Sequence, residues 1–412
     1  MAAGLKDDSA WAAFRHRDFA FFCAARFLSG VGIQMLNVAV GWLVYELTGS
    51  ALALGLVGLA AFLPVVSLAL FAGHVADRLD RRRILVAAYG TVAAAATALL
   101  LYLLAGGTAV WPLFLAVTAM GSARAFANPA SQALVPNLVP IRHFGNAIAW
   151  NSSTWQTATI IGPALGGGLY VLGAPTVFAA AAAALALTTL LLAALRHRSA
   201  TRPREPASWA SLLAGLVFIR SQQVMLGAIS LDLVAVLLGG ATALLPIFAE
   251  EILAVGPAGL GLLRSMPAAG AALMALLLAW RPIRRRAGRK MLLAVAVFGF
   301  ATVGFGLSQT VWLSLLCLLV LGAADMVSVF VRQTLVQLET PDAMRGRVAA
   351  VNSVFIGASN ELGEFESGTL AALVGAVGAV VIGGAGSVAA AAFWAWRFPA
   401  LRERDELIRQ ER

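Results

Sequence analysis

The chain has 412 residues, of which 60% are hydrophobic and only 12% are charged, and its mean hydropathy is +0.85. A soluble globular protein carries roughly 25% charged residues, so this composition excludes that class. The net charge of +10 does not indicate a nucleic-acid partner, because the arginines cluster at the ends of long apolar runs. The composition predicts a multi-pass membrane protein.

The apolar runs are unbroken and rich in Ala, Leu, Val and Gly. Only helices and closed barrels satisfy their backbone polar groups inside a bilayer. Barrel strands would alternate polar and apolar residues over segments of about ten residues. We therefore expect an all-α membrane protein with twelve transmembrane helices, near residues 19–45, 51–73, 84–106, 110–136, 145–172, 174–195, 221–249, 257–280, 290–308, 311–338, 346–372 and 375–397.

Basic residues alternate between the predicted loops. The loops near 78–83 and 281–290 and the stretch 196–220 carry many arginines, whereas those near 46–50, 106–109 and 250–256 carry no Lys or Arg. The positive-inside rule then predicts that both termini lie on the cytoplasmic side of a bacterial-type inner membrane. The first residues show no apolar core or cleavage site, so we expect no cleaved signal peptide.

The two halves of the chain resemble each other. A polar stretch at 196–209 divides the sequence, and a shift of 201 residues aligns 131–152 with 332–353. Matches include Asn151 with Asn352, Gly162 with Gly363 and Gly167 with Gly368. We expect an N-terminal six-helix bundle over 1–195, a cytoplasmic linker over 196–220 and a C-terminal bundle over 221–412. Two such repeats with a site between them are a known transporter plan.

The segment "GHVADRLDRRR" (73–83) follows the second predicted span. It resembles the signature loop of the major facilitator superfamily, with Asp80 in place of the usual glycine. The resemblance implies a two-bundle fold and a loop that latches the cytoplasmic gate, its Asp lying at the positive end of helix 11. An ordinary positive-inside loop would explain the arginines but not Gly73 and Asp77 at this spacing. The matching positions are Gly73, Asp77, Arg78, Arg81 and Arg82.

The segment "IIGPALGGG" (160–168) lies in the fifth predicted span. Gly162, Pro163, Gly166 and Gly167 match the Gly-Pro-x-x-Gly-Gly element of the same superfamily, which is associated with antiporters. The resemblance implies an exporter. The alternative is generic close packing of small residues around a proline bend. The repeat places "LGEFESG" (362–368) at the equivalent position.

Charged residues inside the predicted spans are the sharpest functional signal, since each costs about 2.5–3.5 kcal/mol at the bilayer centre. In the resembled fold, helices 1, 4, 7 and 10 line the central cavity. Four of the charges fall on those helices, and Gln34 and Asn37 extend the polar face of the first. Arg124 and Asp325 are equivalent in the repeat and are predicted to meet. Static ion pairs between helices are the alternative. The charged residues are Arg26, Arg124, Asp232, Arg264, Asp325, Glu361, Glu364 and Glu366.

Glu361 and Glu364 share one helical stripe, with Glu366 pointing elsewhere. Two adjacent carboxylates in a low dielectric cannot both ionise cheaply, so we expect at least one to bind and release a proton. Two alternatives stay open. Arg264 could neutralise one carboxylate in a fixed network, or both carboxylates could be counter-charges for a cationic substrate.

The segment "RAFANPASQALVP" (124–136) resembles a stretch of a bacterial exporter branch that includes enterobactin-type siderophore exporters. Our hypothesis is a secondary active, proton-coupled exporter of amphipathic small molecules of the drug or siderophore class. It would use alternating access and function as a monomer in the lipid bilayer. One alternative is an importer of a nutrient or organic anion, with Arg26 and Arg124 as binding groups. Another is a non-transporting membrane sensor or scaffold.

Other chemistry is not predicted. No nucleophile–base pair or metal cluster suggests an enzyme, and no P-loop suggests an ATP motor, so the proton gradient is the expected energy source. Cys23 and Cys317 lie in separate apolar segments and are expected to be packing residues. We expect no cofactor, no metal and no nucleic-acid partner.

Overall fold

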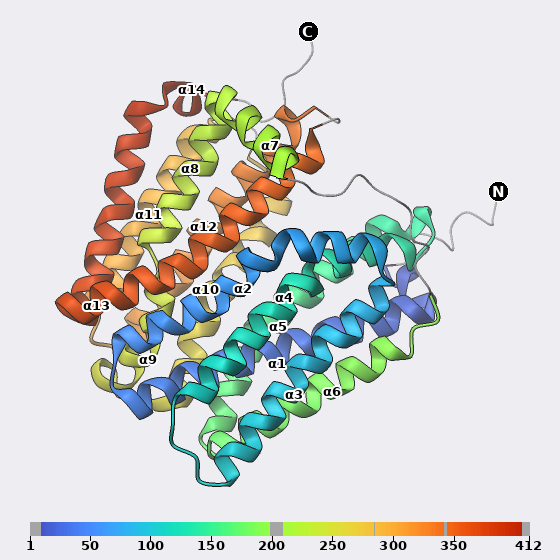
Figure 1. Ribbon diagram of the computed structural model, residues 1–412. Helices are drawn as coiled ribbons and strands as arrows, with labels where there is room; N and C mark the ends of the chain where they lie inside the picture. The colour runs from blue at the N-terminus through green and yellow to red at the C-terminus, as the bar shows by residue number, and fades with distance from the viewer. Residues whose placement is uncertain (1–9, 198–208, 284, 342–343, 406–412) are drawn as a thin grey trace. The chain divides into compact units, whose positions relative to one another are not determined.

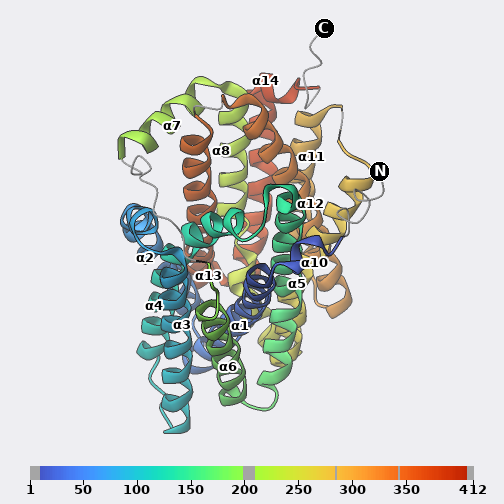
Figure 2. The same ribbon diagram turned by 90° about the vertical axis from the view of Figure 1, so that its right-hand side faces the viewer.

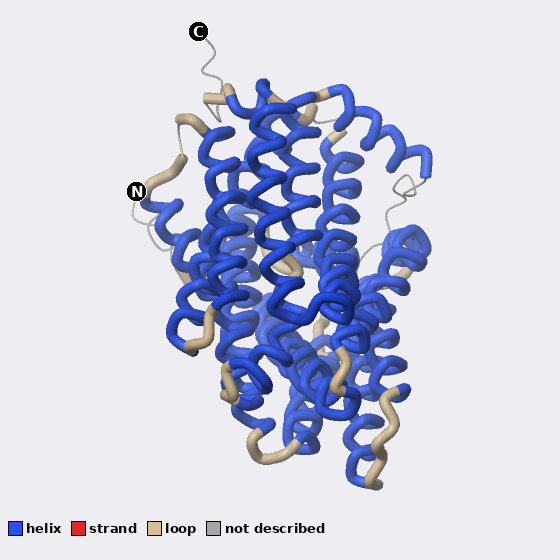
Figure 3. Tube along the Cα trace, turned by 90° about the vertical axis from the view of Figure 1, so that its left-hand side faces the viewer, coloured by secondary structure: helices blue, strands red, loops and turns tan. Residues whose placement is uncertain are grey.

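The computed structural model describes residues 10–197, 209–283, 285–341 and 344–405. These residues form helices and loops, with no strand among them (Figure 3). The predicted all-α fold is confirmed. The chain divides into two compact units, called here the N-terminal unit (Met1–Leu43 with Leu63–Ala207) and the C-terminal unit (Val44–Phe62 with Ser208–Arg412). The domain boundaries expected from the sequence stay a prediction.

The N-terminal unit is built from six long helices. Within it, α3 packs along both α4 and α6 (Figure 1). The helices are α1 (Arg17–Thr48), α2 (Ala51–Arg78), α3 (Arg81–Leu104), α4 (Trp111–Leu134), α5 (Phe144–Tyr170) and α6 (Ala174–Ala193). The joined ends of α1 and α2, residues 44–62, cluster with the C-terminal unit instead.

Asp80 begins α3. Its side chain accepts a hydrogen bond from the backbone N–H of Arg82 at 3.0 Å, which makes it the N-cap of the helix. Such a cap satisfies one of the orphan donors of the first turn and typically contributes about 1 kcal/mol. The residue that departs from the signature loop therefore has a local structural role.

Two arginines of the same loop tie α3 to neighbouring helix ends. The guanidinium of Arg81 donates to the carbonyl of Ala133 near the end of α4, at 2.8 Å. The guanidinium of Arg82 donates to the carbonyls of Leu192 and Ala193 at the end of α6. Cations are favoured at helix C-termini, where carbonyls lack intrahelical partners. These arginines therefore hold the N-terminal unit together at this end.

The C-terminal unit has a core in which α8, α11, α12 and α13 lie side by side (Figures 1 and 2). Leu231, Met291, Val331 and Leu335 are among its fully buried side chains. Helix α7 lies partly within the stretch expected to be a linker. The helices are α7 (Trp209–Ser221), α8 (Gln223–Leu238), α9 (Leu245–Ile247), α10 (Gly256–Trp280), α11 (Ala287–Leu307), α12 (Val311–Glu339), α13 (Arg345–Arg397) and α14 (Pro399–Arg402).

Glycines interrupt two helical runs of the C-terminal unit. The run that starts with α8 breaks at Gly239 and Gly240 and resumes through α9 into a π-helix, Phe248–Ile252. A Cβ on Gly240 would lie 2.4 Å from the carbonyl oxygen of Gly363 on α13, so only glycine fits there. Helix α13 breaks at Gly375, whose φ of 80° and ψ of 161° are open to glycine but strained for other residues. Two predicted spans, 346–372 and 375–397, meet at this break.

Nine of the described helical segments are long and apolar enough to cross a membrane, with α13 counted once. Large apolar side chains are exposed along them: Leu101 is 61% exposed, Leu190 66% and Trp312 84%. Lipid is the solvent that favours such a surface. The multi-pass membrane character is confirmed, whereas the count of twelve spans and the orientation of the termini stay predictions.

Candidate functional site: a buried carboxylate cluster

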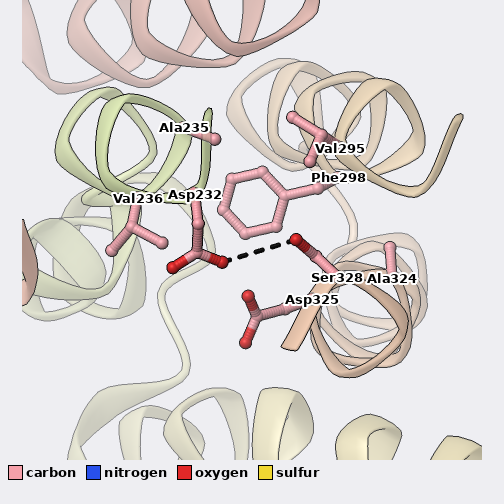
Figure 4. Close-up of a pocket in the computed structure, with 8 residues that line it drawn as sticks. All are labelled: Asp232, Ala235, Val236, Val295, Phe298, Ala324, Asp325 and Ser328. Carbon is pink, nitrogen blue, oxygen red and sulfur yellow. Dashed lines mark hydrogen bonds between the residues drawn. The ribbon is translucent and has the colours of Figure 1, made fainter. Parts of the chain in front are cut away.

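Two of the predicted carboxylates meet in the C-terminal unit. Asp232 on α8 and Asp325 on α12 line the same small cavity, and Figure 4 shows both carboxyl groups directed into it. Phe298 of α11 closes one side. The free volume is about 10 Å³, roughly the space that one water molecule needs. The sequence predicted both residues as candidates on helices that line a central cavity, but it paired Asp325 with Arg124 and did not predict that Asp232 and Asp325 lie together.

A buried arginine neutralises one of the two carboxylates. The Nε of Arg332 lies 3.3 Å from Oδ2 of Asp232, and both side chains are less than one-tenth exposed. The Ser328 hydroxyl donates to Oδ1 of Asp232 at 3.4 Å. Arg332 also donates from Nη1 to Oδ1 of Asn352 on α13, at 2.8 Å. One guanidinium thus joins α8, α12 and α13.

Asp325 is the other carboxylate, and it differs from Asp232 in its contacts. No side-chain hydrogen bond or ion pair of Asp325 is found within the part of the chain that the structure describes. The cluster therefore contains two carboxylates and one guanidinium. With one bound proton, the charges of the cluster sum to zero. A low dielectric penalises net charge and therefore favours this singly protonated state.

Arg332 was missed among the charges inside the predicted spans. It lies within the tenth predicted span, 311–338. Asp325, Ser328 and Arg332 are spaced i, i+3 and i+7, which places them on one face of a helix. This spacing is the sequence signal that could have identified Arg332 as a neighbour of Asp325. The partner on α8 could not be read from it, because that contact joins segments about a hundred residues apart.

The glutamates of α13 lie elsewhere in the C-terminal unit. Glu361 and Glu364 are half-buried, and neither lines the cavity between the aspartates. Glu364 packs against Gly58 of α2: a Cβ at Gly58 would lie 2.8 Å from the Glu364 Cβ. Glu366 is half-buried, with one carboxylate oxygen 3.4 Å from the Ser367 hydroxyl. Their proposed proton role stays a prediction.

The polar residues of α1 form contacts within the N-terminal unit. The guanidinium of Arg26 lies over the Trp155 ring of α5, 4.3 Å from its centroid, and its buried Nε has no hydrogen-bond partner in the described residues. Asn37 donates to Gln34 at 3.0 Å. Arg26 is thus held by an aromatic ring, a favourable position for a cation.

The remaining predicted residues do not line the cavity between the aspartates. Arg124 is exposed on α4, and Arg264 is half-buried on α10. Gly73 and Arg78 lie in the last turns of α2, and the side chain of Asp77 lies outside the described residues. The gate latch, the meeting of Arg124 with Asp325 and the neutralisation of a glutamate by Arg264 stay predictions.

The small-residue element of α5 is a helix contact. A Cβ on Gly162 would lie 2.6 Å from the Cβ of Gln34 on α1. Its repeat equivalent, Gly363, faces α8 in the same way, and a Cβ there would lie 2.9 Å from the carbonyl oxygen of Val236. The close packing of α5 on α1 is thus repeated by α13 on α8. The other members of the element are also buried, namely Pro163, Gly166 and Gly167.

Comparison with known proteins agrees with this architecture. The family model described as "Transmembrane secretion effector" matches residues 8–411. The chain is 29% identical over 381 residues to the enterobactin exporter EntS of Citrobacter koseri, covering 90% of this chain and 86% of the relative. The enterobactin exporter of Shigella boydii is likewise 29% identical over 378 residues.

Solved structures show the same fold at low sequence identity. The nucleoside transporter NupG superposes with a TM-score of 0.66 at 17% identity, covering 93% of this chain and 98% of that one. The peptide-transporter-family protein PepTSo gives a TM-score of 0.73 at 10% identity, covering 94% of this chain and 98% of that one. These relatives are transporters rather than enzymes, and the chain belongs to the transmembrane secretion effector family of the major facilitator superfamily.

Proposed function

We propose that the protein is a proton-coupled exporter of amphipathic small molecules, and that Asp325 carries the coupled proton. The observation that supports this proposal is the cluster of two carboxylates and one guanidinium. Arg332 is engaged with Asp232 at 3.3 Å, so Asp325 is the carboxylate left for a proton. A proton that binds there neutralises the cluster, and its release leaves one net negative charge in the protein interior.

Coupling requires that the proton change the balance between two states of the transporter. The cluster joins three helices, because Arg332 of α12 contacts Asp232 of α8 and Asn352 of α13. When Asp325 is charged, it competes with Asp232 for the same guanidinium. Protonation removes that competition and leaves the Arg332–Asp232 pair intact. A proton on Asp325 would therefore act on the packing of α8, α12 and α13, which is the kind of link that coupling requires.

The proposed substrate class is supported by the relatives. Two relatives that match 90% of this chain are exporters of enterobactin, a siderophore. An exporter of amphipathic molecules needs an apolar cavity with few polar groups. The polar groups of α1, Arg26, Gln34 and Asn37, are candidates for substrate contacts in the N-terminal unit.

The test uses purified protein in liposomes with a trapped pH-sensitive dye. Enterobactin and lipophilic cationic drugs are added, and proton movement and compound uptake are followed together. We expect Asp325→Asn to abolish substrate-driven proton movement while compound binding survives. The surface variant Glu403→Gln, which removes an exposed carboxylate, controls for charge removal.

Two outcomes would contradict the proposal. If Asp325→Asn retains full proton movement while Glu361→Gln or Glu364→Gln loses it, the coupling carboxylate lies on α13. If the wild type moves substrate without any proton movement, the protein is not proton-coupled. Uptake in the direction opposite to the proton distinguishes antiport from import of the same compound.

A further inference from the structure

A basic hollow lies at the C-terminal end of the C-terminal unit, where α11 begins and α14 ends. Its volume is about 260 Å³. Figures 1 and 2 show α14 and the start of α11 at the same end of this unit. The lining residues are Arg286, Arg289, Arg402, Glu403, Arg404 and Asp405.

Backbone contacts build this hollow. The N–H of Arg286 donates to the carboxylate of Asp405 at 2.9 Å, and the N–H of Gly288 donates to the carbonyl of Arg404 at 3.1 Å. A Cβ on Gly288 would lie 1.6 Å from the carbonyl oxygen of Leu401, so glycine is required for this approach. The segment after α14 is thereby fixed against the first turn of α11.

The acidic side chains of the hollow are already engaged. Glu403 pairs with Arg402 at 3.1 Å, and the carboxylate of Asp405 accepts the backbone bond described above. Arg404 pairs with Glu339 of α12 at 2.9 Å. Arg286 and Arg289 are exposed and form no ion pair within the described residues. Two guanidinium groups are therefore available to an anion.

The repeat has a similar hollow in the N-terminal unit, with a volume of about 370 Å³. It lies where α3 begins and α6 ends, the third and sixth helices of that unit. The first hollow lies where the third predicted span of its own half begins and the sixth ends. An arginine-lined recess thus occurs at the corresponding place in both units. The lining residues here are Asp80, Arg82, Arg83, Val86, Ala87 and Ala193.

Two exposed tryptophans precede the residues of the first hollow in the chain. Trp280 closes α10 and is 84% exposed, and Trp396 lies at the end of α13 and is 73% exposed. Exposed tryptophans at the ends of membrane helices mark the headgroup region of a bilayer. Both precede the hollow directly in the chain, since Arg286 follows α10 and Arg402 follows α13. The free arginines are therefore at the level of the lipid headgroups.

We propose that this hollow binds the phosphate-bearing headgroup of an anionic membrane lipid, with Arg286 and Arg289 contacting the phosphate. Guanidinium groups pair with phosphate oxygens through two parallel hydrogen bonds, which suits a fixed recess. Basic pockets between membrane helices bind such headgroups in general. The bound lipid would join the start of α11 to the segment that follows α14.

The experiment measures lipid binding by the full chain in detergent. Phosphatidylglycerol, phosphatidylcholine and inorganic phosphate are titrated separately, and thermal stabilisation and native mass spectrometry report binding. We expect phosphatidylglycerol to stabilise the wild type and the double variant Arg286→Ala/Arg289→Ala to bind it about 25-fold more weakly, since each of the two arginines near a membrane surface contributes about fivefold. Arg289→Gln alone serves as a milder variant if the double variant fails to fold.

The matched control is Arg281→Ala/Arg285→Ala, which removes two exposed arginines of the same loop that do not line the hollow. Retained binding in this control supports the proposal. Equal weakening in the control would mean that general surface charge attracts the lipid, and the proposal would be overturned. Equal stabilisation by inorganic phosphate or by phosphatidylcholine would also overturn the assignment to an anionic lipid.

Discussion

Arg332 and Asp232 form an ion pair between α12 and α8 that is almost completely shielded from solvent, with Nε and Oδ2 3.3 Å apart. The pair lies beside a second carboxylate, Asp325. A buried pair of this kind is weak evidence for stability on its own, because desolvation offsets the Coulomb attraction. The pair matters here because it occupies Arg332 and leaves the Asp325 carboxylate as the group that can bind a proton.

Arg332→Ala should destabilise the protein by about 3–5 kcal/mol, because it leaves the Asp232 carboxylate buried without a partner. The double variant Asp232→Asn/Arg332→Ala should recover part of this loss. Thermal unfolding in detergent measures both. The exposed pair of Arg402 and Glu403 gives the comparison: Arg402→Ala should cost no more than about 1 kcal/mol. If Arg332→Ala loses no more stability than Arg402→Ala, the buried ion pair does not stabilise the fold as predicted.

Gly368→Ala should destabilise the C-terminal unit by about 1–3 kcal/mol. Its Cβ would lie 2.5 Å from the Cα of Gly55, which is backbone and cannot rotate away. Gly357 is the matched control on the same helix, since nothing lies within 4 Å of a Cβ there. Gly357→Ala should be neutral or slightly stabilising. Unfolding midpoints in one detergent compare the two, and equal midpoints would contradict the close contact.

Gly166→Ala should weaken the packing of α5 on α1 and reduce transport, because its Cβ would lie 2.9 Å from the Cα of Met35. The loss of stability should be about 1–3 kcal/mol. Gly168 is two residues away and has nothing within 4 Å of a Cβ, so Gly168→Ala should keep both stability and transport. If stability is unchanged in Gly166→Ala while export stops, the element acts in the transport cycle rather than in packing.

Stability should fall as the pH is lowered below 6.5, because of a histidine pair outside the membrane spans. Nε2 of His16 lies 3.0 Å from Nδ1 of His143, which requires a proton-free nitrogen in the pair. Burial, followed by the charges of His143 and Arg142, lowers the pKa of His16 below its ordinary value of 6.5. The unfolded chain then binds more protons than the folded protein, so acid favours unfolding, and the effect levels off below the folded-state pKa.

The measurement compares melting temperatures at pH 7.5 and 5.5. His16→Gln should show a smaller difference between the two pH values than the wild type. His197→Gln, which changes another histidine of the N-terminal unit, should behave like the wild type. An unchanged pH difference in His16→Gln would show that other groups dominate the acid sensitivity.

Much of the helical architecture was predictable because a lipid environment requires it. A chain that is 60% hydrophobic must form helices that satisfy their own backbone in lipid. The repeat also anticipated a spatial relation: Gly162 and Gly363, matched in sequence, occupy equivalent close contacts on α1 and α8. The signature loop indicated the superfamily, although Asp80 proved to be the N-cap of α3.

The sequence by itself thus determined the membrane class, the helical fold and most of the intramembrane charges, Arg332 excepted, because a charge inside a long apolar run is costly in lipid whatever it contacts. Only the tertiary structure decided which charges meet. Asp232 and Asp325 line one cavity and Arg332 pairs with Asp232, whereas Glu361 and Glu364 do not line that cavity. Charge pairing depends on distance, and the distance between residues of different helices is set by packing that a single sequence does not display.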